Sequence, residues 1–270
     1  MNNKSNCDTK ILLDRVFTLT ECFLFLAIFF VLAWYFEMIQ GANTYGWYSK
    51  LIMILLGFIG IFLHKKPGEY GLVPKNWRFS LKWGAYIFLL FIGLSFLTIL
   101  ISILLSIANL EVDPRTLVVD FIWYFIFVGF AEELFFRGYV QSRLNEVFTH
   151  KYDRILGVEF KWSKGTLITG VALFGVPHIL TGINPFTGRA VISPIIVMVT
   201  LFACFLGVIL GVLREKTGGV VLPTILHSLI DFTVYGVGRI VGIVLSNIAT
   251  GIAIFLFFAF FFQKILKEKA

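Results

Sequence analysis

Three ionisable residues interrupt an apolar stretch in the middle of the chain. Glu132, Glu133 and Arg137 lie within residues 128–140, and the preceding residues 117–127 contain one charge. A charged side chain at the centre of a bilayer costs about 2.5–3.5 kcal/mol on translocon scales. Charges that a chain keeps at this cost mark a functional site by default. The stretch therefore predicts a membrane-spanning helix that carries such a site.

Composition supports a membrane protein. The 270 residues are 58% hydrophobic and 14% charged, whereas a soluble domain has about a quarter charged residues. We expect an all-α polytopic membrane protein whose residues 1–270 form a single integral membrane domain. The net charge of +7 is attributed to loops that face an anionic leaflet. Membrane lipid is therefore the expected partner, and nucleic acid is not.

Apolar windows give about eight transmembrane helices. A window of about 20 residues is needed to cross a hydrocarbon core of roughly 30 Å. The second window is short, and the fourth carries the charged motif. The predicted spans are 17–39, 46–63, 83–108, 117–140, 165–183, 190–213, 218–238 and 240–263.

The basic residues alternate between the segments that join these helices. Alternate segments, beginning with the N-terminus, hold 19 Lys and Arg against 4 in the others. Lys50 is counted in the first loop, and six basic residues are counted in a fourth loop over 137–164. Because cytoplasmic loops carry an excess of Lys and Arg, this asymmetry predicts that both termini are cytoplasmic.

Ionisable residues also occur in the fifth and seventh predicted helices. His178 lies in the fifth, and His227 and Asp231 lie in the seventh. With the termini cytoplasmic, the rise per residue of a helix places these groups and Glu132 between the cytoplasmic face and the midplane. We therefore expect catalytic residues on helices 4, 5 and 7, in a site that opens toward the cytoplasm.

Residue spacing separates the two glutamates. Glu133 and Arg137 are four residues apart, so they can pair on one helix face, while Glu132 points about 100° away. His227 and Asp231 also share a face. Glu21, Glu37 and Asp120 fall near predicted interfaces and are expected to be solvated or topological. His64 falls in a basic loop and is expected to be a surface residue.

The residue types are suited to hydrolysis. A carboxylate and an imidazole on different helices can hold a water molecule and take its proton, and a second imidazole can stabilise an oxyanion. Alternatively, zinc could bind His178, His227 and either Glu132 or Asp231. The HExxH signature of common zinc proteases does not occur in the sequence.

Three short motifs resemble those of a known family. Glu132-Glu133-x-x-x-Arg137, Phe174-x-x-x-His178 and His227-x-x-x-Asp231 are similar to the motifs of the CPBP intramembrane endopeptidases. That family includes the type II CAAX prenyl proteases and bacterial proteins of bacteriocin processing or self-immunity. The resemblance covers residues 117–240, which would be the catalytic core helices. Asn is common at the end of the third motif in prenyl proteases, so Asp231 leaves the substrate open.

The resemblance implies a role for each matched residue. Glu132 would be the general base, with His178 helping to hold the water. His227 and Asp231 would stabilise the oxyanion or the substrate. Glu133 and Arg137 would pair and orient the site. This mechanism needs no metal, so no cofactor is favoured, and zinc stays the alternative.

The expected function is an intramembrane endopeptidase that cleaves near the cytoplasmic face. Its substrate would be a prenylated protein of the CAAX type, a leader peptide or another membrane-anchored peptide. The alternative is a non-catalytic immunity or scaffold protein, or a transporter that uses the polar cluster. A transporter predicts inverted repeats, and none is evident in the sequence. The expected location is the cell membrane of a prokaryote, and the oligomeric state is left open.

Overall fold

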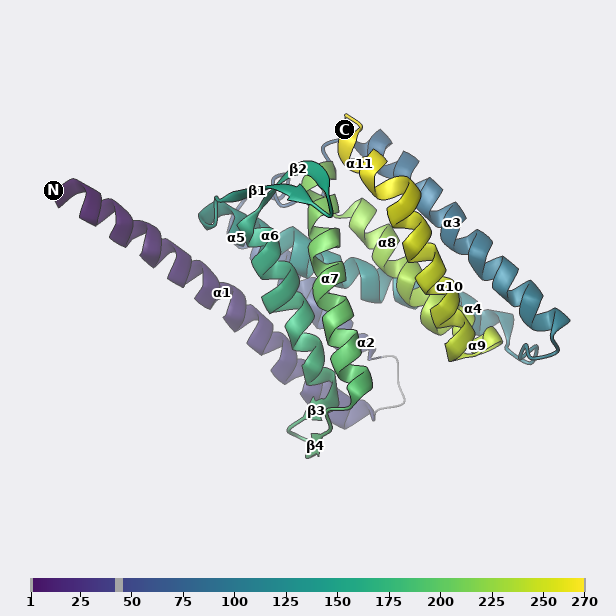
Figure 1. The fold of residues 1–270 in the computed structure, drawn as a ribbon. Helices are drawn as coiled ribbons and strands as arrows, with labels where there is room; N and C mark the ends of the chain where they lie inside the picture. The colour runs from purple at the N-terminus through teal and green to yellow at the C-terminus, as the bar shows by residue number, and fades with distance from the viewer. Residues whose placement is uncertain (1, 42–45, 270) are drawn as a thin grey trace.

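The computed structural model describes residues 2–41 and 46–269 and shows a bundle of long helices (Figure 1). Six of its helices are long and apolar enough to cross a membrane. Their exposed faces are rich in large apolar side chains, as expected of helices that contact lipid. These six are Thr9–Gln40, Trp77–Leu104, Lys164–Gly182, Pro194–Thr217, Val221–Val241 and Ile243–Lys267.

Two further helices correspond to the second and fourth predicted spans. The helix α2 (Trp47–Leu63) is apolar but has only 17 residues. The other is continuous from Pro114 to Val147 and carries the charged motif, and we call it the motif helix. An all-α polytopic architecture is thus confirmed, while the total of eight spans stays a prediction.

Several helices are built from consecutive segments. The long helices α1 (Asn2–Gln40), α3 (Trp77–Leu104) and α7 (Pro194–Thr217) are uninterrupted. The motif helix comprises α4 (Pro114–Ile122), η1 (Trp123–Phe130), η2 (Glu133–Val140) and α5 (Gln141–Val147). The remaining segments are α6 (Lys164–Ile168), η3 (Thr169–Gly175), η4 (Val176–Gly182), α8 (Val221–Asp231), η5 (Phe232–Val237), α9 (Gly238–Val241), α10 (Ile243–Leu256), η6 (Phe257–Phe262) and α11 (Gln263–Lys267).

The predicted basic loop at 137–164 is wrong in its first part. Residues 137–147 continue the motif helix, and an antiparallel hairpin of β1 (Lys151–Ile155) and β2 (Val158–Ser163) follows. Hydropathy ends a helix where charges begin, but here the first basic side chain, Arg137, is fully buried. A second small hairpin, β3 (Ile183–Asn184) and β4 (Arg189–Ala190), joins η4 to α7.

Local sequence signals account for several helix ends. The side chains of Asn76, Asp113 and Ser193 accept hydrogen bonds from the first-turn amides of α3, α4 and α7, as N-cap residues do. Pro follows Asp113 and Ser193, at the position where its missing N–H costs nothing. Gly218 ends α7 with φ +66°, a conformation that Gly adopts without strain.

The bundle has two ends of different charge. The basic end carries the β1–β2 hairpin, the start of α3 and α11, and it lies at the top in Figure 1. Lys82 and Glu268 pair there, with Nζ 2.9 Å from the carboxylate. The opposite end carries the β3–β4 hairpin, the α9–α10 junction and the last turn of α1 (Figure 1). Segments that hold many of the basic residues by the sequence count thus lie at one end of the bundle.

The motif helix lies in the interior. Its residues Leu134, Phe135 and Tyr139 are fully buried against side chains of α1 and α2. A second apolar core joins α3, α7, α8 and the C-terminal helices. The charged motif therefore lies among packed helices and does not project from the surface.

The acidic residues expected to be solvated are instead paired. Glu21 accepts hydrogen bonds from Arg143 and Tyr139 at 2.8 and 2.7 Å and lies 2.7 Å from the ring of His64. Asp120 is fully buried and contacts Arg239. Glu37 contacts Arg189. Sequence position near a helix end could not reveal partners that come from other helices.

Candidate active site

Glu133 and Arg137 form a buried ion pair on the motif helix. Nη1 of Arg137 lies 2.9 Å from Oε1 of Glu133, and both side chains are fully buried. The guanidinium also donates to the carbonyl of Gly207 at 3.2 Å and lies 4.0 Å from the centre of the Phe174 ring. The predicted pairing of these two residues is present in the structure.

Close helix packing brings the Gly207 carbonyl to Arg137. A Cβ atom on Gly207 would lie 2.4 Å from the carbonyl oxygen of Gly170, and one on Gly175 would lie 2.4 Å from Cα of Cys204. Only glycine permits this approach of η3 to α7. These glycines therefore place both Phe174 and the Gly207 carbonyl beside the guanidinium.

Glu132 faces away from this pair, as the spacing predicts. Its carboxylate contacts the ammonium of Lys50, which lies in the first turn of α2. Its second oxygen lies 3.8 Å from Nε2 of His227. Glu132 thus reaches an open cavity, whereas its neighbour Glu133 is enclosed.

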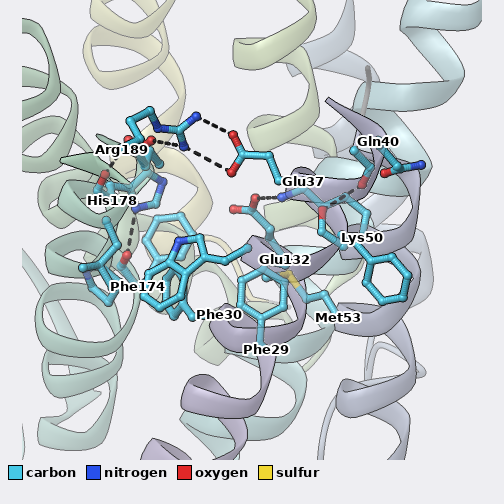
Figure 2. A pocket seen from close by; sticks show the side chains of 18 of the residues that line it. Phe29, Phe30, Glu37, Gln40, Lys50, Met53, Glu132, Phe174, His178 and Arg189 are labelled. Carbon is cyan, nitrogen blue, oxygen red and sulfur yellow. Dashed lines mark hydrogen bonds and ion pairs between the residues drawn. The ribbon is translucent and has the colours of Figure 1, made fainter. Parts of the chain in front are cut away.

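His178 lies near Glu132 on a different helix. Its Nδ1 is 2.8 Å from the carbonyl oxygen of Phe174. A carbonyl oxygen only accepts, so Nδ1 carries the proton, and Nε2 of the neutral ring has a free lone pair. Figure 2 shows His178 and Glu132 on different sides of one pocket. His178 therefore offers a proton acceptor to a molecule bound there.

His227 lies among three carboxylates. Its Nδ1 is 2.8 Å from Glu133, and its Nε2 is 3.5 Å from Asp231 and 3.8 Å from Glu132. Lys50 and Arg137 supply two positive charges against these three carboxylates. One proton shared by His227 and Asp231 makes the cluster neutral. Because uncompensated charge is costly inside a membrane, we expect that proton to be retained.

The cavity has a volume of about 350 Å³ and combines apolar walls with charged groups. Glu132, His178 and Lys50 line it, together with the Glu37–Arg189 pair. His227 and Asp231 are not among its lining residues, but Nε2 of His227 lies 3.8 Å from Glu132, which lines it. Its aromatic walls are formed by Phe29, Phe30, Trp34, Phe36, Phe136 and Phe174.

The cavity lies toward the end of the bundle opposite the basic end. Its lining includes the last turn of α1, the start of α2 and Arg189 of the β3–β4 hairpin. His178 lies 14 residues after Lys164 but only four before Gly182. Two expectations from the sequence, cytoplasmic termini and a site that opens toward the cytoplasm, therefore do not fit together.

Three charged residues of the cavity were missed by sequence reasoning. Lys50 and Arg189 were counted in loops, and Glu37 was placed near a predicted interface. Hydropathy cannot detect a lysine at the start of a helix as short as α2. The available signal was the shortness of α2 itself, because a span of 17 residues leaves its first turn inside the bilayer.

The residues named for the zinc alternative are not arranged as a metal-ligand cluster in the part of the chain that the structure describes. Among residues 2–41 and 46–269, no group of three or more His, Cys, Asp and Glu side chains is placed to hold a metal ion. Nδ1 of His178 is hydrogen-bonded to a backbone carbonyl, and Nδ1 of His227 lies 2.8 Å from Glu133. The residues named for zinc thus lie near one another without forming a ligand set.

Comparison with protein families identifies the core of the chain. Residues 114–233 match the family model described as type II CAAX prenyl endopeptidase Rce1-like. Searches of curated proteins and of solved structures gave no match. The matched segment contains all three motifs and favours a protease over a transporter or scaffold. The resemblance seen in the motifs is thereby confirmed: residues 114–233 are similar to the type II CAAX prenyl endopeptidases, which are CPBP-type intramembrane proteases.

Proposed function

We propose that Glu132 and His178 activate a water molecule that hydrolyses a peptide bond inside the membrane. The observation that supports this is their position on two helices around one cavity, where each offers a free acceptor atom. Glu132 takes a proton from the water as the water oxygen bonds to the peptide carbonyl carbon. That proton then passes to the leaving nitrogen as the carbon–nitrogen bond breaks.

His227 and Asp231 act behind Glu132 in this mechanism. They were expected to stabilise the oxyanion or the substrate, but neither is among the residues that line the cavity. The short distances from the His227 ring to Glu133 and Asp231 support a role in orienting Glu132 and balancing its charge. Glu133 and Arg137 fix the position of the His227 ring.

The cavity walls suggest a lipidated or membrane-anchored peptide as substrate. Six aromatic side chains line a space that lies among membrane-spanning helices. Aromatic walls bind apolar chains well, and a few charged groups fix their orientation. A CAAX-type peptide carries its prenyl chain on a cysteine near the C-terminus, so it combines an apolar group with a short peptide.

The test is cleavage of reporter peptides by the purified protein in lipid vesicles. One internally quenched peptide carries a farnesylated cysteine before three C-terminal residues, and a second carries a membrane anchor without a prenyl group. We expect Glu132→Gln and His178→Ala each to lower cleavage by about 10²–10⁴-fold, the usual contribution of a general base. Lys82→Met removes a surface ion pair and serves as control. Undiminished cleavage in either site variant contradicts the mechanism.

A further inference from the structure

Lys50 is the permanent cation in contact with Glu132. The ammonium of Lys50 bonds Oε1 of Glu132, and the two side chains are 18% and 12% exposed. The other nearby cations are engaged elsewhere, since Arg137 bonds Glu133 and Arg189 bonds Glu37. Lys50 is therefore the residue that can compensate the charge of Glu132.

The packing of α2 places Lys50 at this point. Gly57 and Gly60 face the motif helix, where a Cβ would lie 3.1 Å from Cγ of Leu134 and 2.5 Å from the Tyr139 ring. Lys50 is two helical turns before Gly57, so both lie on the same side of α2. Two glycines that allow close approach thus bring the ammonium within reach of Glu132.

The position is an unfavourable one for lysine on local grounds. Positive charge in the first turn of a helix is repelled by the helix dipole, and a side chain inside the membrane adds a cost of desolvation. A carboxylate at the same place is favoured by both the dipole and the ammonium. The arrangement therefore stabilises the ionised form of Glu132, while the lysine lowers the stability of α2.

We propose that Lys50 is a positioning residue that keeps Glu132 ionised and directed into the cavity. This inference rests on the proposed function, in which Glu132 must accept a proton. Lys50 touches neither the water nor the substrate in this role. Lys50 acts through Glu132. Without the ammonium of Lys50, Glu132 would be the carboxylate of the cluster that is least able to stay ionised.

The other charged groups around Glu132 explain why it needs Lys50 to stay ionised. It is faced by Glu133 on its own helix, by His227 and Asp231 on α8, and by His178 on η4. Glu37 of α1 and Arg189 of β4 line the same cavity as an ion pair. Without Lys50, three carboxylates would share Arg137 and one proton. Glu132 then becomes protonated at neutral pH and loses its function as a base.

The pH–rate profile separates this role from a merely structural one. In Lys50→Met, we expect the acidic limb of the profile to move up by about one to three pH units, with cleavage at neutral pH falling roughly 10–1000-fold and recovering at alkaline pH. Lys50→Arg keeps the charge and should retain the wild-type profile. Equal loss at every pH in Lys50→Met would overturn the proposal.

A second readout does not depend on cleavage. Infrared difference spectra at neutral pH should show, in Lys50→Met, one protonated-carboxyl band in addition to those of wild type, Lys50→Arg and the control Lys82→Met. The double variant Lys50→Met/Glu132→Gln should lack that band. If the band is absent in Lys50→Met, the proposal fails even when cleavage is observed. If wild type cleaves nothing but the band appears, only the proposed function fails.

Discussion

The buried pair of Glu133 and Arg137 joins three helices through a few atoms. Oε1 of Glu133 contacts both Arg137 and His227, while the guanidinium also bonds the carbonyl of Gly207 in α7. Both side chains are fully buried. Removing one member of such a pair leaves an uncompensated buried charge, which is more costly than losing both.

Arg137→Met should therefore destabilise the protein strongly. We expect the free energy of unfolding to fall by about 3–5 kcal/mol, measured by reversible unfolding in mixed micelles. The double variant Glu133→Gln/Arg137→Met should be more stable than Arg137→Met alone, because it removes the carboxylate that has lost its guanidinium partner. If the double variant is no more stable than the single one, Arg137 contributes through its packing on Phe174 and not through charge.

Chelation tests the metal-free mechanism. The residues available for zinc form no ligand cluster in the described ranges, and in the proposed mechanism Glu132 and His178 activate the water without a metal. Exhaustive treatment with a chelator should leave cleavage of the reporter peptides within about twofold of the untreated enzyme. Loss of activity that zinc alone restores would establish the zinc alternative instead.

At the scale of residues, motif spacing predicts which side chains on one helix pair, but it does not predict contacts between helices. The i,i+4 rule correctly separated Glu132 from Glu133 and paired the latter with Arg137. The bond from His227 to Glu133 and the contact of Lys50 with Glu132 link residues 94 and 82 positions apart. No periodicity within one helix carries that information, so both were missed.

At the scale of helices, the approach of η3 to α7 depends on glycine. Gly207→Ala would place a methyl group 2.4 Å from the Gly170 carbonyl oxygen and force the two helices apart. We expect a loss of about 1–3 kcal/mol of stability, typical of overpacking, and reduced cleavage as the Gly207 carbonyl leaves Arg137. Thermal unfolding and the peptide assay measure both.

Gly251 in α10 is the matched control for this substitution. Its Cβ would meet nothing within 4 Å, and alanine is the better helix former by about 1 kcal/mol. Gly251→Ala should therefore be neutral or slightly stabilising. Equal effects of Gly207→Ala and Gly251→Ala would mean that the packing of η3 on α7 has no special role.

Helix positions were predictable because apolar runs of membrane length are a strong signal. Each predicted span overlaps one helix, for example 165–183 with Lys164–Gly182. The prediction was weakest where charge lies inside a helix. The motif helix extends to Val147 because Arg137 and Arg143 are paired with Glu133 and Glu21, and hydropathy counts such residues as loop.

At the scale of the whole molecule, charge distribution and cavity position point in different directions. Lys50 and Arg137 do not belong to extramembrane loops, and without them the count of basic residues is still 18 against 3. The asymmetry that predicts a cytoplasmic basic end is thus retained. On this topology, the position of the cavity favours an opening on the side opposite the expected cytoplasmic one.

We therefore predict that the cavity faces the side of the membrane opposite the termini. In a variant without its three cysteines, Phe186→Cys in the β3–β4 turn should react with a membrane-impermeant maleimide on intact cells. Leu156→Cys in the β1–β2 turn should react only after permeabilisation, and both positions are exposed. This result favours a membrane-anchored peptide reached from the outer side. The reverse pattern would contradict the charge-based orientation and favour a prenylated protein, because prenyl chains are attached to cytosolic C-termini.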